Sequence, residues 1–305
     1  MKASIDIGSN SILLLAGEYE DGRFIESINI ARVTGLGKGI DKTGELSPEG
    51  IKRALEALTE YKEKLSLFGI SPHETLVTAT EASRVAKNFS EFSLNVKNKL
   101  GFRIHLLNAE GEAYFCARGV NFGDDTILED SVVLDLGGAS TELIKFSSKP
   151  FTFKQYVSLP VGSVRATDWM EEGSFEKNIE LIFKNFEIDD FKNNEVIGVA
   201  GTITTLAAMM LDISSYADKK VMGKMFEINL FEEFIERLEE MSLAEISKRY
   251  PVAGKRVSTI VGGSKVTLAI CKKLEMKKLF ISTYGLRFGI IIEEEINQKF
   301  LQVEN

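Results

Sequence analysis

Metal-ligating and nucleophilic side chains are scarce in this sequence, which has two cysteines and two histidines among 305 residues. Cys116 and Cys271 form no CxxC or other ligand spacing, and each lies in an apolar helical pattern, so we expect two buried core thiols. His73 and His105 are isolated in the chain, which argues against a zinc site and against a histidine-based catalytic triad.

Long apolar runs and an excess of basic residues are also missing. No stretch approaches the roughly 18 consecutive apolar residues of a membrane span, and no charged-then-apolar leader opens the sequence. We therefore expect a cytoplasmic protein with no membrane partner. The formal net charge of −8 argues against a DNA or RNA duplex as partner. It still allows a local basic pocket for a smaller polyanion, because a cleft focuses the field of the charges that line it.

Short apolar, β-branched runs alternate with long helical patterns, which predicts an α/β protein. At 305 residues the chain exceeds the usual size of a single core, so we expect two domains. The turn signal NFGDD at 121–125 places the boundary between a first domain, 1–123, and a second, 124–288. Residues 289–305 have a helical pattern and could pack back on the first domain.

The two halves open in the same way. Strands at 2–7 and 11–17 are predicted to form a hairpin that turns at Gly8-Ser9-Asn10, and a third strand covers 24–30. The second half repeats this order with strands at 131–136, 142–147 and 151–159. We interpret this as a duplication of topology, not of sequence. Further predicted elements are a helix that starts after Ser47 as N-cap, strands at 75–80 and 102–107, a helix at 111–120, and two α/β segments at 195–202 and 278–285.

The two hairpin turns carry the first candidate chemistry. Asp6 and Asp135 each leave a strand and enter a turn of small residues, where backbone amides and hydroxyls can crowd around an anion. The predicted phosphate-binding residues are Ser9, Asn10 and Ser11 in the first turn, and Gly137, Gly138, Ser140 and Thr141 in the second. An aspartate beside such a cradle is explained by a hydrated Mg²⁺, which binds carboxylates and phosphate oxygens. Each turn alone could be an ordinary tight hairpin, but two of them favour the phosphate interpretation.

A third glycine turn lies in GVAGTITTLAAMM at 198–210. Gly201 precedes Thr202, which we expect to be the N-cap of a helix whose exposed amides meet phosphate or a nucleotide. Simple helix capping explains the same residues.

The motifs DIGSNS and DLGGASTEL resemble the phosphate loops of the exopolyphosphatase/guanosine pentaphosphate phosphatase (Ppx/GppA) family, within the actin/Hsp70/sugar-kinase superfold. RVTGLGKGI, TATEASRVAKN, AGTITTLAAM, SLPVGSVRATD and STYGLRFG are also similar to family segments, so the resemblance runs over essentially the whole chain. It implies two ribonuclease H-like/actin-like domains with an interdomain cleft. It also implies a short form of the family that lacks further C-terminal helical domains.

The resemblance implies roles for individual residues. Glu112 in LLNAEGEAYF matches the family's catalytic base, Arg84 matches an arginine that faces the terminal phosphates, and Glu142 matches a carboxylate near the metal. The expected activity is Mg²⁺-dependent hydrolysis of a terminal phosphoanhydride, in inorganic polyphosphate or guanosine pentaphosphate. Glu112 would orient the attacking water and accept its proton. The alternative is that these residues have no functional role. Glu112 would then be a solvated first-turn residue of a helix, Arg84 a surface ion-pair residue and Glu142 an exposed strand residue.

The sequence departs from the family at several acids. Gly111 replaces a glutamate before Glu112, Ser258 and Thr283 replace acids, and Phe288 replaces a glutamate. These changes leave the substrate preference open. Two alternatives to a hydrolase therefore remain: a non-catalytic sensor of polyphosphate or an alarmone, and a phosphotransferase of the same superfold. A homodimer is compatible with the sequence.

Overall fold

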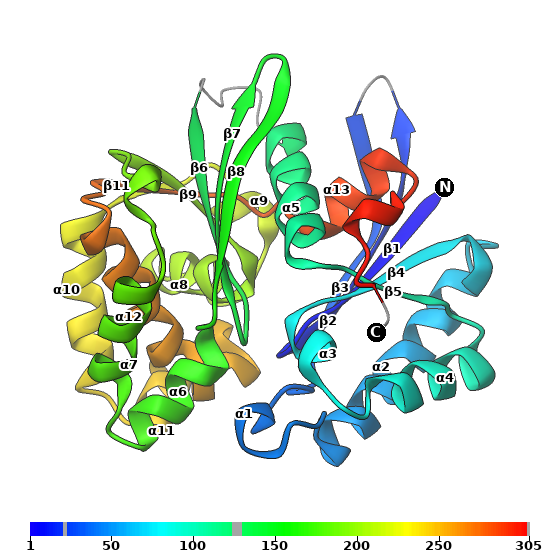
Figure 1. The fold of residues 1–305 in the computed structure, drawn as a ribbon, viewed down its shortest axis with the longest axis horizontal. Helices are drawn as coiled ribbons and strands as arrows, with labels where there is room; N and C mark the ends of the chain where they lie inside the picture. The colour runs from blue at the N-terminus through cyan, green and yellow to red at the C-terminus, as the bar shows by residue number, and fades with distance from the viewer. Residues whose placement is uncertain (21–22, 124–129, 304–305) are drawn as a thin grey trace. The chain divides into compact units, whose positions relative to one another are not determined.

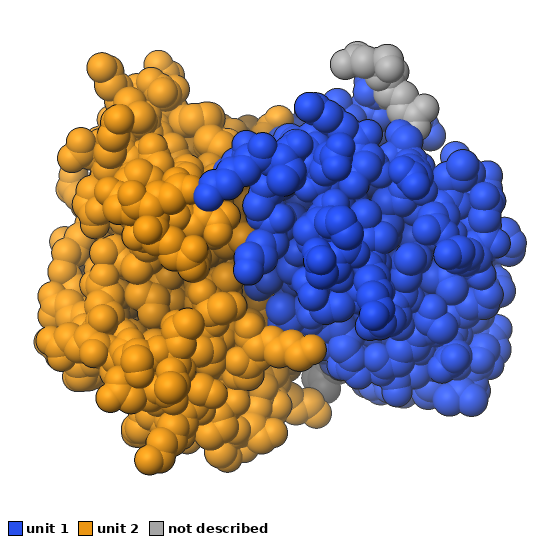
Figure 2. All heavy atoms as spheres, turned by 90° about the horizontal axis from the view of Figure 1, so that it is seen from below, with its two compact units in different colours: residues 1–119, 286–305 blue, residues 120–285 orange. Residues whose placement is uncertain are grey.

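Each half of the chain folds around a mixed β-sheet in the computed structural model, which describes residues 1–20, 23–123 and 130–303. The chain divides into two compact units, one made of residues 1–119 and 286–305 and the other of residues 120–285 (Figure 2). The division falls a few residues before the predicted junction at 123/124. Residues 124–125 of the predicted NFGDD turn lie outside the described residues.

The sheet of the first unit has the order β3-β2-β1-β4-β5 (Figure 1). Its first three strands are antiparallel neighbours, and β4 and β5 run parallel to β1. The strands are β1 Lys2–Ile7, β2 Ser11–Glu20, β3 Arg23–Val33, β4 Thr75–Ala79 and β5 Ile104–Leu106. The helices of this unit are α1 Ile40–Thr43, α2 Pro48–Ser66, α3 Glu81–Val85, α4 Phe89–Leu100, α5 Ala109–Gly123 and α13 Leu286–Glu293, with α5 continuing into the second unit.

Alternation along β1 explains how this sheet is covered. Ile5 and Ile7 are buried in one apolar cluster with Leu58 of α2 and Phe92 of α4. Ser4 points to the other face, as expected for a period of two, and its hydroxyl donates to the carbonyl of Arg287 in α13 at 3.1 Å. The first unit therefore has α2 and α4 on one face of its sheet and α13 on the other.

The second unit has a six-stranded sheet in the order β10-β11-β9-β6-β7-β8. Its strands are β6 Ser131–Leu136, β7 Thr141–Ser148, β8 Phe151–Leu159, β9 Glu195–Val199, β10 Met225–Glu227 and β11 Lys278–Ile281. Its helices are α6 Ser163–Glu171, α7 Phe175–Asn185, α8 Ala200–Met210, α9 Asp218–Val221, α10 Ile228–Glu239, α11 Leu243–Arg249 and α12 Val257–Lys273. One large apolar cluster joins these elements.

The predicted duplication of topology is confirmed and extends to fine detail. A constant shift of 129 residues carries the β1–β2 pairing onto the β6–β7 pairing, so that Ile7↔Ile12 corresponds to Leu136↔Thr141. The same shift carries a β-bulge between Ala16 and Gly17 onto a bulge between Lys145 and Phe146. Bulges bend and twist a strand locally, so both hairpins are shaped in the same way.

Some predicted boundaries match the structure and others differ from it. Ser47 caps α2 by accepting the amide of Gly50 at 3.0 Å, as predicted. The α/β segment predicted at 195–202 consists of β9 up to Val199 and the start of α8 from Ala200. The helix predicted for 111–120 begins earlier, at Ala109. The last helix ends at Glu293, since Glu294 has a left-handed backbone with φ 64° that interrupts the helix.

Both cysteines are buried thiols outside any disulfide, as predicted. Burial raises the pKa of the Cys271 thiol to about 12. Within the described ranges, no helix combines the length and the apolar character that crossing a bilayer requires.

We expect Cys116 and Cys271 to resist thiol reagents in the folded protein, because the thiolate is the reactive form and neither sulfur is reached by solvent. Titration with Ellman's reagent at pH 8 should detect no fast thiol in native protein and two thiols in denaturant. A native thiol that reacts as fast as free cysteine would contradict the burial.

Candidate functional site

The two predicted phosphate turns have the same backbone geometry. The amide of Gly8 donates to the carbonyl of Ser11 at 3.0 Å, and the amide of Gly137 donates to the carbonyl of Ser140 at 3.0 Å. A Cβ atom at either glycine would lie 3.1 Å from that serine carbonyl oxygen. Glycine thus keeps both turns tight.

In each turn, the carbonyls are held by the unit's own backbone. Asn10 accepts the amides of Thr34 and Gly35, both at 2.9 Å. In the second turn, Gly137 accepts the amide of Ser163 at 2.9 Å, and Gly138 accepts that of Val164 at 2.8 Å. Among the described residues, no backbone carbonyl accepts the turn amides, which belong to Ser9, Asn10, Gly138 and Ala139. Each turn therefore has spare donors and occupied acceptors, which suits an anion.

Two further glycines let other segments approach these turns. A Cβ at Gly37 would lie 2.9 Å from the Cβ of Ala82 and 3.1 Å from that of Ser9. A Cβ at Gly162 would lie 2.4 Å from the carbonyl carbon of Gly138, so only glycine allows α6 to begin against the second turn.

Asp135 and Glu142 are direct partners across the β6–β7 pair, so their side chains project from the same face of the sheet. Glu142 is buried, and the hydroxyl of Ser158 on β8 donates to it at 2.8 Å. The position that corresponds to Glu142 in the first unit is Leu13, the partner of Asp6. The carboxylate pair is therefore a feature of the second unit alone. Two carboxylates that leave coordination positions to waters and phosphate oxygens suit Mg²⁺. A metal held by protein side chains alone needs at least three ligands, and the part of the chain that the structure describes contains no such set.

Arg84 and Glu112 lie together in the first unit. The Nη1 atom of Arg84 is 2.7 Å from the carboxylate of Glu112 and 3.0 Å from the carbonyl of Leu107. Its Nε and Nη2 atoms donate to Glu81 at 3.1 and 2.7 Å. The side chains of Arg84 and Glu112 are only 9% and 11% exposed. The alternative view of Glu112 as a solvated helix residue is therefore wrong, and so is that of Arg84 as a surface ion-pair residue.

The structure adds two residues that sequence analysis missed. The hydroxyls of Thr34 and Ser83, like that of Ser11 and the amide nitrogen of Asn10, are buried and find no hydrogen-bond partner among the described residues. A buried polar group without a partner costs about 1–3 kcal/mol, so these groups indicate a site that a ligand or water completes. No local motif marks Thr34 or Ser83; only the fold brings their segments to the first turn.

Three other predicted residues have structural contacts. Thr141 is fully buried and its hydroxyl donates to the carbonyl of Val161 at 2.5 Å, so its single donor is already used. The prediction that Thr202 is the N-cap of α8 is wrong, because the helix starts at Ala200 after Val199. A Cβ at Gly201 would lie 2.2 Å from the guanidinium of Arg256, whose pKa is lowered by burial.

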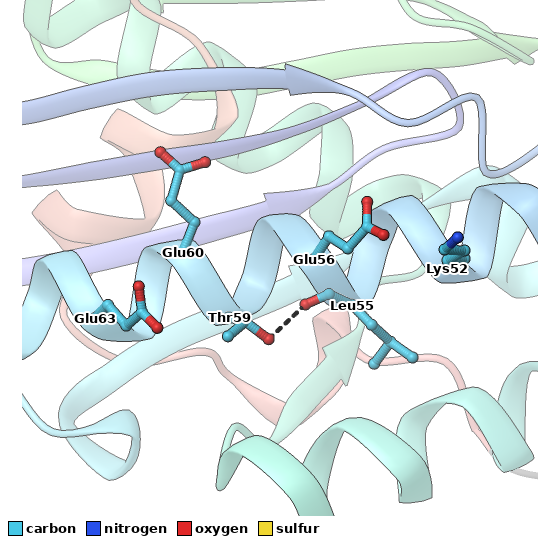
Figure 3. A pocket seen from close by; sticks show the side chains of 6 residues that line it. All are labelled: Lys52, Leu55, Glu56, Thr59, Glu60 and Glu63. Atoms are coloured by element: carbon cyan, nitrogen blue, oxygen red, sulfur yellow. Dashed lines mark hydrogen bonds between the residues drawn. The ribbon is translucent and has the colours of Figure 1, made fainter.

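Two further arginines of the first unit, Arg32 and Arg118, are paired with Glu60 and Glu293. Figure 3 shows Glu60 beside a hollow on α2 whose lining includes Glu56 and Glu63. Three glutamates against one lysine make this hollow acidic, which does not suit a polyanion. Its other lining residues are Lys52, Leu55 and Thr59.

The departures at Phe288 and Thr283 also have structural explanations. Phe288 is buried and makes an edge-to-face contact with Phe24 at 6.0 Å, in a place where an unpaired carboxylate would be strongly unfavourable. The hydroxyl of Thr283 contacts the sulfur of Met222 at 3.5 Å. Ser258 lies in the first turn of α12.

The sequence profile of the Ppx/GppA phosphatase family matches residues 20–298. The chain belongs to this family. It is 27% identical to a bifunctional 3-dehydroquinate synthase/phosphatase of Fusobacterium nucleatum, over 96% of this chain and 46% of that protein. It is 26% identical to a guanosine-5'-triphosphate,3'-diphosphate pyrophosphatase of Vibrio atlanticus, over 95% of this chain and 58% of that protein. The chain thus spans about half the length of these curated relatives.

Solved structures confirm the fold. The crystal structure of the Ppx/GppA family member of Aquifex aeolicus matches with a TM-score of 0.77 and 30% identity, over 96% of both chains. An exopolyphosphatase of Cytophaga hutchinsonii matches with a TM-score of 0.82 and 22% identity, over 95% of this chain and 96% of that one. The predicted α/β fold of the actin-like type is therefore confirmed.

Gly162→Ala should lower the free energy of unfolding by about 1–3 kcal/mol, because the new methyl group meets the backbone of the second turn. Gly285→Ala in the same unit is the control, since nothing lies within 4 Å of its Cβ position, and its effect should stay within about 0.5 kcal/mol. Denaturant unfolding of both variants measures the difference. Equal stability of the two would show that the close approach at Gly162 is not required.

Proposed function

We propose that this chain hydrolyses the terminal phosphoanhydride bond of inorganic polyphosphate or guanosine pentaphosphate. Family membership and the names of the curated relatives support the reaction class. The observation that carries the proposal is the buried pair of Glu112 with Arg84, because it sets a carboxylate suited to act as a base beside a cation suited to bind phosphate. The two hairpin turns with spare amides support a substrate rich in phosphate.

In the proposed reaction, Glu112 orients a water molecule toward the terminal phosphorus and accepts its proton. The oxygen of water bonds to phosphorus as the bridging P–O bond breaks, and the shortened chain leaves with the bridging oxygen. Hydrolysis of this kind is limited mainly by positioning and by charge on the phosphate oxygens. Arg84 and the amides of the turns stabilise that charge.

We further propose that Asp6, Asp135 and Glu142 serve Mg²⁺. Asp135 and Glu142 fit this role because they share one sheet face, and one or two carboxylates suffice for an ion that keeps several waters. Bound Mg²⁺ would offset the charge of the phosphate oxygens.

Glu112→Gln should lower phosphate release by about 10²–10⁴-fold, because the amide cannot accept the proton of the attacking water. The assay uses long-chain polyphosphate and guanosine pentaphosphate, each with Mg²⁺ and with EDTA, and binding is measured in parallel. We expect release by the wild type with Mg²⁺ only, and intact binding by the variant.

Undiminished release by Glu112→Gln would reject Glu112 as the base. Wild-type protein that binds either ligand without releasing phosphate would support the sensor instead. Loss of phosphate to an added acceptor, with none released to water, would support the phosphotransferase.

Glu81→Gln should lower the KM for polyphosphate roughly two- to tenfold, with kcat little changed. Glu81 accepts from two nitrogens of Arg84 and so competes with a phosphate for the same guanidinium. Glu91→Gln is the control for net charge, because Glu91 is exposed in α4 of the same unit. A KM that rises in Glu81→Gln, or falls equally in both variants, would contradict this competition.

A further inference from the structure

A short segment near the C-terminal end of the described chain lies across the start of α5. The amide of Gln302 donates to the carbonyl of Leu106 at 2.8 Å, and the amide of Asn108 donates to the carbonyl of Phe300 at 2.9 Å. Leu107 and Leu301 form an antiparallel bridge between these bonds. Residues 298–302, which we call the strap, thus continue the pairing of β5 on its outer edge. Figure 1 shows this end of the chain beside β5.

Asn108 joins the strap to the helix through both ends of its side-chain amide. Its Oδ1 atom accepts the amide of Gly111 at 2.8 Å, which caps the first turn of α5. Its Nδ2 atom donates to the carbonyls of Lys299 at 2.8 Å and Leu301 at 3.3 Å. One side chain therefore fixes the helix start and the strap relative to each other.

Gly111 and Phe300 explain why the helix lies so close to the strap. A Cβ at Gly111 would lie 2.6 Å from the carbonyl oxygen of Phe300 and 2.8 Å from its Cβ. The ring of Phe300 stacks on Tyr114 at 4.5 Å and meets Phe115 edge-to-face at 5.3 Å. The strap thus occupies the space where any side chain at position 111 would project.

Glu112 is the next residue along this helix. Its amide donates to the carbonyl of Asn108 at 3.1 Å, and its carboxylate meets Arg84, which also binds the carbonyl of Leu107. The strap contacts Leu106, Leu107 and Asn108. It therefore holds the segment that positions the carboxylate of Glu112 and the guanidinium of Arg84. No contact of the strap with the reacting groups is needed for this effect.

We propose that the strap is a positioning element for Glu112, with Asn108 and Phe300 as its positioning residues. The proposal rests on the proposed function, in which Glu112 is the base. A base must meet the attacking water within hydrogen-bond distance, and a displacement of about 1 Å can cost on the order of 10²-fold in rate. Loosening the strap therefore lowers kcat without removing any group that touches the substrate.

Asn108→Asp is the variant that isolates the strap. The new carboxylate keeps an oxygen to cap Gly111, but it loses the Nδ2 donor and faces the carbonyls of Lys299 and Leu301. Asn193→Asp is a matched control in the second unit. Asn193 also accepts a backbone amide with Oδ1, from Glu195 at 3.2 Å, and donates with Nδ2 to the carbonyl of Asp130 at 3.1 Å.

Phosphate release from polyphosphate should show a kcat about 10- to 100-fold lower in Asn108→Asp, with KM within about twofold of the wild type. Asn193→Asp should keep the wild-type kcat. Combining Asn108→Asp with Glu112→Gln should add little to the loss of Glu112→Gln alone, because both changes act on the same group. Phe300→Leu, which keeps an apolar side chain but removes the stacking on Tyr114, should lower kcat in the same direction and gives a second test if Asn108→Asp does not fold.

A wild-type kcat in folded Asn108→Asp or Phe300→Leu, while Glu112→Gln is inactive, would reject the positioning role of the strap and leave the proposed function intact. Equal losses in Asn108→Asp and Asn193→Asp would also overturn it. Full activity in Glu112→Gln would instead reject the proposed function.

Discussion

The proposed chemistry depends on one backbone constraint, a hairpin turn whose carbonyls accept amides of its own unit while its own amides meet no backbone carbonyl among the described residues. The constraint occurs twice, with the same 3.0 Å bond from Gly8 to Ser11 and from Gly137 to Ser140. Different segments satisfy it: Thr34 and Gly35 bind the first turn, whereas the start of α6 binds the second. Because an amide that meets no backbone carbonyl suits an anion, the fold supplies two turns that fit the proposed phosphate binding before any charged side chain is considered.

Around this common frame, the two units carry different chemistry. The second unit adds a carboxylate to its strand pair, so that Asp135 faces Glu142, whereas the corresponding partner of Asp6 is Leu13. The first unit has Arg84 with Glu81 and Glu112 in a mostly buried group. A buried ion pair contributes little net stability because its charges must be desolvated. Stability therefore does not account for this cluster, which fits the reactive role proposed for it, and the proposed strap adds a structural reason for the position of Glu112.

Much of the fold could be predicted from the sequence, because local patterns set it. The strands at 131–136 and 151–159 and the Ser47 cap follow from alternation and capping rules. The N-cap proposed at Thr202 was wrong, because α8 already begins at Ala200, which adopts an unusual φ of 72° that no local signal indicates. Thr34, Ser83 and the pairing of Glu81 with Arg84 were missed because each depends on which segments the fold brings together. The sequence shows that position 111 has glycine where the family has glutamate. The reason, the close approach of Phe300, could not be predicted because Phe300 lies almost 190 residues further along the chain.

The central claim is that water attacks a terminal phosphorus. It is tested most directly by running the reaction on polyphosphate with Mg²⁺ in ¹⁸O-enriched water and measuring the released orthophosphate by mass spectrometry. The account predicts that each orthophosphate carries one solvent oxygen, because the terminal phosphorus keeps the oxygen of the attacking water. Orthophosphate without label, or ligand binding with no orthophosphate formed, would contradict it.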